Sequence, residues 1–363
     1  MRRTLFVLIA ALLGLSIAGA IAEVGVLLIF GEQVKFPRHV VGAPFGIRIN
    51  DPGAVYRHKS PDVNVWFRIN AQGMRADRDY PRQKPAGLQR IASLGDSFTV
   101  GYEVEGDQTF SSVLERQLRA AGRSVEVLNA GVSGFGTAEE LLYLERDLFD
   151  YSPDVVLVSF YQNDLVDDVR SDLFRLENGK LVVGRETYVP GGRLGDYLNR
   201  SWLLNWLSGY SNAFAMVKEA ANVLVKHEVV EQNLAQQAHA TGSDSGAEDP
   251  EAARERALAG ALFERIYSDC RERGIPLVIQ SIPTPNKNEH PTDLMELFPF
   301  AEFDVKREGL SFLPAKSVLQ PHLEHEVLYY AHSHQHWTPF SHRVSGEALA
   351  KLILDANLLD RPR

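Results

Sequence analysis

The sequence predicts an α/β domain built on a parallel sheet and preceded by an apolar N-terminal segment. From Arg90 onward, short apolar runs alternate with longer segments whose apolar residues recur every three or four positions. These are the patterns of buried strands and of amphipathic helices. Strands that alternate with helices pair in parallel through right-handed crossovers. Of the 363 residues, 45% are hydrophobic and 23% are charged, a composition typical of a globular chain that buries a large core.

The N-terminal segment is long and apolar enough to span a membrane. The 19 residues at 4–22 carry no charge, and as a helix they rise about 28 Å, close to the hydrocarbon thickness of a bilayer. Small residues at 18–22 resemble a signal-peptide cleavage site, but apolar residues resume after Glu23. We therefore favour an uncleaved transmembrane anchor at 1–32 over a removed signal peptide and over a buried core helix. Arg2 and Arg3 favour a cytoplasmic N-terminus, although Lys35, Arg38 and Arg48 on the other flank nearly balance them. The sequence therefore favours, by a small margin, a domain held at the membrane outside the cytoplasm.

Residues 33–88 are rich in Pro, Gly and Arg and are predicted to wrap the domain as an irregular lead-in with short extended pieces, such as residues 63–70. The domain itself is predicted at 89–363. Its first elements are a strand at 90–95, a helix at 109–122, a strand at 125–131, a helix at 138–148 and a strand at 153–161.

The alternation pauses at about 165–255, which we interpret as an insertion into a single domain. The insertion contains a hairpin with a turn at Glu177-Asn178-Gly179, a helix at 201–225 and a polar loop at 238–252. For the aromatic stripe of the helix (Trp202, Leu203, Trp206 and Tyr210) we favour a packing face over a substrate platform. The alternative, a stripe that lines an acyl or sugar groove, stays open because the insertion follows the third strand. The remaining predicted elements are a helix at 253–274, a strand at 275–283 and a helix at 346–359.

Charge and cysteine content narrow the function classes. The formal net charge is −9 and no basic run is present, which argues against a nucleic-acid partner. The single cysteine, Cys270, excludes an intrachain disulfide and a Cys-based zinc site. We predict no cofactor and no metal. The alternating His332, His334 and His336 would share one side of an extended segment, but we favour solvated or supporting roles for His332 and His334 over zinc ligation.

Small and amide-bearing residues follow each of the first three predicted strands. Gly95-Asp96-Ser97 follows the first, residues 129–137 follow the second, and residues 161–164 follow the third. Ligands collect at the carboxyl ends of parallel strands, so we expect a site there. A serine nucleophile needs a base, and its tetrahedral intermediate needs hydrogen-bond donors. The backbone N–H of Gly134 and the side-chain amide of Asn163 are candidate donors, and histidines precede the last helix.

Four blocks occur in the order and approximate spacing of the SGNH (GDSL-like) hydrolases. They are GDSFT, NAGVSG, YQND and HWTPFSH. The chain resembles this family, in its bacterial membrane-anchored type, over about 64–355 apart from the insertion. The resemblance implies a flavodoxin-like three-layer α/β/α sandwich with a five-stranded parallel sheet. It also implies Ser97 as nucleophile, His336 as general base, and an oxyanion hole made by the N–H groups of Ser97 and Gly134 and the amide of Asn163.

Two positions depart from the pattern of the family. Gln162 stands where the family usually has Gly, and Ser333 stands where the family has the Asp that orients the histidine. Loss of that carboxylate costs about four orders of magnitude in rate in the triad template. We consider three outcomes: a backbone carbonyl or the Ser333 hydroxyl orients His336, a carboxylate such as Glu324 or Glu326 substitutes, or the enzyme is slow or inactive.

The sequence therefore predicts a serine esterase that hydrolyses acyl or acetyl esters of a small molecule or glycan through an acyl-enzyme intermediate. Its other predicted partner is the lipid bilayer, through the N-terminal helix. Two alternatives stay open: an O-acetyltransferase or deacetylase of extracytoplasmic polysaccharide, and a catalytically degenerate domain that binds glycan or lipid. We expect Asp96 to fix the turn beneath Ser97, Asp164 to brace the loop after the third strand, and His342 to be structural.

Overall fold

The apolar runs of the domain form a five-stranded parallel sheet. The strands are β5 (Gln89–Gly95), β6 (Val125–Asn129), β7 (Val155–Tyr161), β10 (Leu277–Ile282) and β13 (Leu310–Pro314). Their spatial order is β13-β10-β7-β5-β6, and every neighbouring pair is parallel. Taken in chain order, this is the 2-1-3-4-5 order of flavodoxin-like folds. The structure, a computed structural model, describes residues 2–30, 40–59, 62–189, 197–198, 201–218, 250–285, 293–331 and 336–360.

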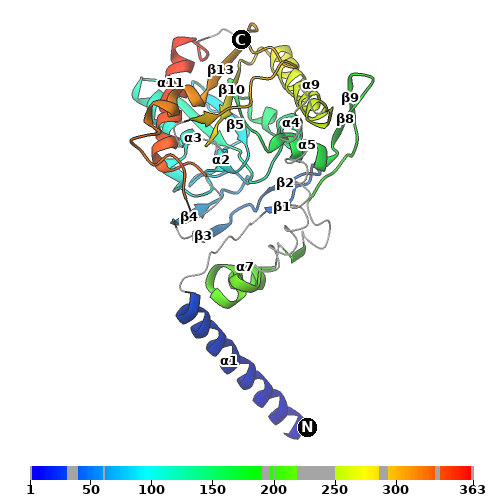
Figure 1. Cartoon of the computed structure of the whole chain (residues 1–363), viewed down its shortest axis with the longest axis vertical. Helices are drawn as coiled ribbons and strands as arrows, with labels where there is room; N and C mark the ends of the chain where they lie inside the picture. The colour runs from blue at the N-terminus through cyan, green and yellow to red at the C-terminus, as the bar shows by residue number, and fades with distance from the viewer. Residues whose placement is uncertain are drawn as a thin grey trace, which may run out of the picture.

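Helices cover both faces of the sheet and complete the predicted three layers (Figure 1). On one face, α3 (Phe110–Ala120) packs against α11 (Pro339–Asp355). On the other lie α4 (Thr137–Arg146), α5 (Asp164–Ser171) and α9 (Pro250–Glu272). Leu94 belongs to the core under α4 and α9, whereas Ile91 belongs to the core under α3 and α11. Because both faces are covered, the strands are almost continuously apolar.

The insertion starts differently from its prediction. It opens with the short helix α5, which the sequence did not indicate. The hairpin is confirmed as β8 (Phe174–Glu177) and β9 (Lys180–Val183), and Asn178 and Gly179 both have the positive φ that a tight hairpin turn requires.

The predicted aromatic helix is interrupted at Ser211. It forms α7 (Trp202–Tyr210) and a second helical segment at 212–218. The rest of the predicted helix, at 219–225, and the polar loop up to residue 249 lie outside the described residues.

The lead-in contains more regular structure than expected. It forms two antiparallel hairpins, one from β1 (Val40–Gly42) and β2 (Arg48–Asn50), the other from β3 (Val55–Lys59) and β4 (Asn64–Arg68). Alternate residues of β3 and β4 are buried, since one side of this hairpin packs on the domain. The extended piece predicted at 63–70 is confirmed as β4, whereas the sequence did not indicate β1, β2 and β3. The remaining short elements are α2 (Ser97–Val100), η1 (Gly106–Gln108), η2 (Leu148–Tyr151), β11 (Thr284–Pro285), β12 (Leu294–Met295), α10 (Ala315–Leu319) and η3 (Gln320–His322).

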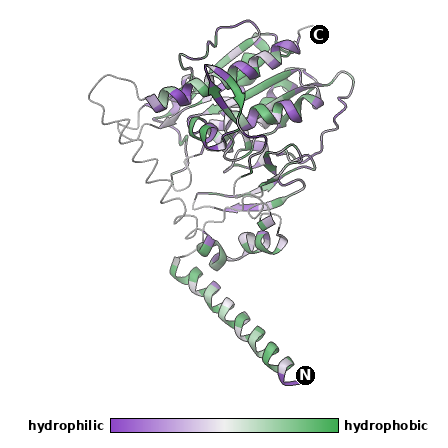
Figure 2. Ribbon diagram, turned by 90° about the vertical axis from the view of Figure 1, so that its right-hand side faces the viewer, coloured by the Kyte–Doolittle hydropathy of each residue, from purple (hydrophilic) through white to green (hydrophobic). Residues whose placement is uncertain are grey.

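The N-terminal segment forms one helix, α1 (Arg2–Phe30), that extends away from the domain (Figures 1 and 2). Within the described residues it is the one helix long and apolar enough to cross a membrane. Its apolar side chains are exposed along most of its length. In Figure 1 the lead-in hairpins and α7 lie between the sheet and α1.

Candidate active site

Ser97 stands at the carboxyl edge of the sheet because β5 passes directly into the short helix α2. A Cβ on Gly95 would come within 2.0 Å of Thr99 Oγ1, so this turn accepts only glycine. Asp96 caps α2, and its carboxylate accepts a hydrogen bond from the Phe98 N–H at 2.9 Å. The prediction that Asp96 fixes the turn beneath Ser97 is confirmed.

The fold brings His336 to Ser97 across 239 positions of sequence. His336 Nε2 lies 2.8 Å from Ser97 Oγ. The imidazole is almost buried, with its ring 5.1 Å from the Phe98 ring and 5.4 Å from the Tyr102 ring, measured between centroids. The Tyr330 N–H donates to the His336 carbonyl at 3.0 Å, which fixes the backbone of the loop before α11. The predicted nucleophile and the predicted base are therefore within hydrogen-bonding distance of each other.

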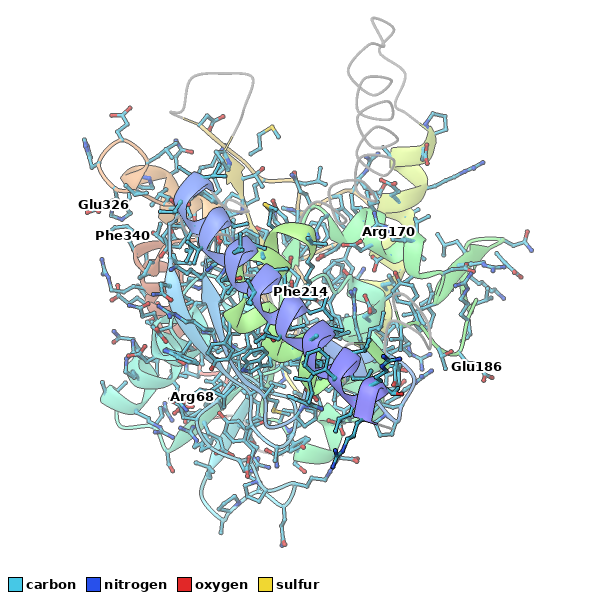
Figure 3. The ribbon with its side chains drawn as sticks, turned by 90° about the horizontal axis from the view of Figure 1, so that it is seen from below. Arg68, Arg170, Glu186, Phe214, Glu326 and Phe340 are labelled. Carbon is cyan, nitrogen blue, oxygen red and sulfur yellow. The ribbon has the colours of Figure 1, made fainter. Side chains whose placement is uncertain are left out.

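The other ring nitrogen of His336 faces a carboxylate that the sequence reasoning missed. His336 Nδ1 lies 3.2 Å from Glu103 Oε2, and the Glu103 side chain is fully buried. The named substitutes Glu324 and Glu326 are both exposed (Figure 3 labels Glu326). Ser333 lies outside the described residues. Of the three outcomes considered for His336, the geometry matches the second, but with Glu103 in place of Glu324 or Glu326.

Glu103 reaches this position because the chain reverses at Gly101. The N–H groups of Gly101 and Tyr102 bond back to the carbonyls of Phe98 and Ser97, at 3.1 and 3.0 Å, and Gly101 has φ +68°. This left-handed C-cap is a conformation that glycine adopts without steric cost. The sequence does contain a local indication of a buried acid near Ser97: Gly101 follows four residues later, and Glu103 stands between the apolar residues Tyr102 and Val104. The approach of His336, 233 positions away, leaves no local signal.

The lead-in encloses the loop that carries Glu103. His58 on β3 is buried, and its Nε2 lies 3.8 Å from Glu103 Oε1. Burial lowers the pKa of His58 in spite of this carboxylate, so the imidazole is neutral at pH 7. The Arg75 guanidinium donates to the carbonyls of Val100, Gly101 and Val104 in the same loop. Burial lowers the pKa of Arg75 to about 10, which leaves it protonated at neutral pH.

Two side chains of β2 hold the loop after β6. The Arg48 guanidinium donates to the Gly134 carbonyl and forms a bidentate pair with Glu139 at 2.9 and 2.8 Å. Asn50 Nδ2 donates to the Gly131 carbonyl at 2.9 Å. Gly134 has φ +79°, and a Cβ there would meet the guanidinium of Arg48 at 3.4 Å. The lead-in thus fixes the backbone of a predicted oxyanion residue.

Asn163 follows β7 at the start of α5. Its Nδ2 donates to Asp167 Oδ2 at 3.1 Å, which orients the amide and leaves a second N–H on the same nitrogen. Asp164 accepts from the Tyr161 N–H at 3.0 Å and braces this loop as predicted. Gly134 and Asn163 therefore lie on loops that follow the two strands flanking β5, at the same edge of the sheet as Ser97.

His342 links two helices of the domain. His342 Nδ1 accepts from the Phe110 N–H at 3.2 Å, and burial lowers the pKa of His342 to about 3, so this histidine is a neutral link between α11 and α3.

Among the described residues, no three His, Cys, Asp or Glu side chains are placed to hold a metal ion. His332 and His334 lie outside the described residues.

Comparisons with known proteins identify the family and a curated protein that is similar over part of the chain. The model of the GDSL-like lipase/acylhydrolase family matches residues 93–299. A curated arylesterase of Vibrio mimicus is 33% identical over 76 residues, or 21% of this chain, and the chain spans 38% of the length of this relative.

Two solved structures are also similar. A putative lipolytic protein of the G-D-S-L family from Desulfitobacterium hafniense has 11% identity and a TM-score of 0.38, with 73% of this chain and 99% of that one covered. A two-domain esterase active on acetylated mannans has 10% identity and a TM-score of 0.38, with coverages of 77% and 52%.

Proposed function

Since the chain belongs to the GDSL-like lipase/acylhydrolase family, we propose that it is a serine esterase whose catalytic groups are Ser97, His336 and Glu103. The observation that carries this proposal is the continuous line of contacts between the three side chains. Ser97 Oγ lies 2.8 Å from His336 Nε2, and His336 Nδ1 lies 3.2 Å from the buried Glu103 carboxylate.

The reaction follows from this order of contacts. The Glu103 carboxylate accepts the Nδ1–H of His336 and so leaves the lone pair on Nε2 facing Ser97. As Ser97 Oγ bonds to the ester carbonyl carbon, its proton moves to Nε2. The alcohol leaves with that proton, and an acyl group stays on Ser97. Water then attacks the acyl-enzyme, again through Nε2, and releases the acid.

The developing oxyanion would be held by three N–H groups, those of Ser97 and Gly134 and the Nδ2 of Asn163. Their placement is supported by the bonds that fix each loop: Asp96 to α2, Arg48 to Gly134 and Asp167 to Asn163. Donors fixed in advance cost no reorganisation when charge develops on the substrate oxygen.

Membrane attachment through α1 belongs to the same proposal. Its support is that the end of α1 contacts the folded part of the chain: Val26 is buried and the Glu23 carboxylate accepts hydrogen bonds from residues 211–213. The helix also runs without a break from Arg2 to Phe30, through the small residues at 18–22. We propose that the helix stays attached and that the domain lies outside the cytoplasm.

The proposal is tested by labelling and by ester hydrolysis. A fluorophosphonate should modify the full-length protein on Ser97 and should block its hydrolysis of p-nitrophenyl acetate. Ser97→Ala should abolish both, whereas Ser317→Ala, at an exposed serine on α10, should change neither. Labelling that persists in Ser97→Ala would disprove the choice of nucleophile. A wild-type protein that is neither labelled nor active would favour a degenerate binding domain, and faster acyl transfer to a sugar oligomer than to water would favour a transferase.

A further inference from the structure

The helix α7 carries an aromatic face that the rest of the described chain does not cover. Trp202, Trp206 and Tyr210 recur every four residues on one side of this helix and are 77%, 52% and 65% exposed. The rings of Trp206 and Tyr210 stack at 6.0 Å between centroids. The prediction that this stripe packs inside the protein is therefore wrong. Several large aromatic side chains exposed together indicate an interaction surface.

The helix α7 is tied to α1 through the side chain of Glu23. This carboxylate accepts from the N–H groups of Asn212 and Ala213 at 2.6 and 3.0 Å, from Asn212 Nδ2 at 2.8 Å and from Ser211 Oγ at 2.9 Å. It therefore caps the helical segment 212–218 that continues directly from α7. These contacts fix the position of α7 along α1. Figure 3 shows α1 crossing the side of the molecule that carries α7 and Phe214.

The position of Glu23 sets the depth of α7 relative to a bilayer. The uncharged residues 4–22 match the thickness of the hydrocarbon core, so Glu23 marks its edge. Tryptophan and tyrosine concentrate at this depth, where an apolar ring meets the polar headgroups. We infer that the aromatic face of α7 (Trp202, Trp206 and Tyr210) lies in the headgroup region of the bilayer that α1 spans.

A bilayer fits this face better than a second protein does. The apolar side chains of α1 that precede Glu23, such as Phe6 and Leu15, are 73% and 71% exposed and require lipid around them. The aromatic face lies beside the end of that same stretch, so a surface that covers one also reaches the other. In addition, α7 contains no charged residue that would call for a complementary charge on a protein partner.

This placement also orients the candidate active site. The helix α7 lies against β3, and His58 of β3 lies 3.8 Å from Glu103. The carboxyl edge of the sheet, where α2 begins at Ser97, therefore faces the side of the domain on which α7 lies.

The inference is tested by tryptophan fluorescence of the full chain in phosphatidylcholine vesicles. The acyl chains carry bromine either close to the headgroups or close to the bilayer centre. We expect emission to be quenched, and more strongly by the shallow bromines. The double variant Trp202→Phe/Trp206→Phe should lose this quenching. The matched control Trp66→Phe, at an exposed tryptophan on β4, should keep it.

Two results would overturn the inference: wild-type emission that brominated lipid does not quench, or quenching that survives in the double variant. Circular dichroism and the thermal midpoint show whether each variant is folded. Because the readout is fluorescence, the result does not depend on whether Ser97 is a nucleophile, and failure of the proposed esterase activity would leave this test intact.

Discussion

At the residue scale, Glu103 supplies the contact that the missing aspartate would otherwise make. It lies six positions after Ser97, so the proposed nucleophile and the proposed acid share one short segment, and only the histidine comes from elsewhere in the chain. The fixed loop places the carboxylate beneath Ser97, and the ring of His336 then fits between the two side chains at 2.8 and 3.2 Å.

We predict that Glu103→Gln lowers kcat by up to about four orders of magnitude, because an amide does not hold the Nδ1–H tautomer or stabilise the imidazolium. KM should change little, since Glu103 is buried behind the histidine. Glu103→Asp should recover part of the rate, and the exposed control Glu324→Gln should behave as the wild type. Steady-state kinetics on a soluble ester measure this. Wild-type kcat in Glu103→Gln would show that another group orients His336.

At the scale of elements, the site depends on short segments that other segments hold in place. The lead-in contacts the loop after β6 through Arg48 and Asn50, and the loop that carries Glu103 through His58 of β3 and through Arg75. The lead-in is therefore part of the site, although its sequence predicted only a wrapping segment.

Gly101 gives a direct test of how an element places Glu103. In Gly101→Ala the new Cβ would lie 2.5 Å from Thr109 Cγ2, at a positive φ. We expect a loss of stability of about 1–3 kcal/mol from strain and contact, together with a lower kcat because the Glu103 loop shifts. Gly122→Ala is the matched control: φ is +85°, but no atom lies within 4 Å of its Cβ. It should lose stability and keep its kcat. Chemical unfolding and kinetics check both variants, and equal kcat values for the two would contradict the argument.

At the scale of the whole molecule, several buried carboxylates make stability depend on pH. Burial raises the pKa of Glu140, Asp164 and Asp168 well above their usual values, and that of Asp96 to about 6. Both carboxylate oxygens of Glu140 lack a hydrogen-bond partner within the described part of the chain. A carboxyl with a raised pKa binds its proton more tightly in the folded state than in the unfolded state. Its contribution to stability is complete below the unfolded pKa and is lost as pH rises through the folded pKa.

We therefore predict that the free energy of unfolding falls as pH rises from about 4.5 past neutrality, by up to about 1.4 kcal/mol per pH unit for each such group. Glu140→Gln removes one titrating group, so its stability should exceed that of the wild type at pH 8 and approach it at pH 5. Thermal midpoints over this pH range test the prediction. The exposed control Glu324→Gln should follow the wild-type curve, and a Glu140→Gln curve parallel to the wild type would contradict the raised pKa.

Three features of this protein can be predicted without its structure: the alternation of strands and helices, the position of Ser97 after the first strand, and the apolar helix at the N-terminus. These features depend on local periodicity, on glycine turns and on the length of an uncharged run, and each of these properties involves only residues that are neighbours in the sequence. His336 was identified by the order of blocks rather than by any local pattern.

Three other features follow from the folded structure alone: Glu103 faces His336, β2 and β3 hold the site, and the aromatic face of α7 is exposed beside Glu23. Each of these features depends on contacts between residues far apart in the chain. Local periodicity predicts helices and strands, but it does not predict which distant side chains come into contact. Burial also has to be known before an acid between Tyr102 and Val104 can be distinguished from a solvated one. For this reason the sequence left the partner of His336 open, and packing determined it.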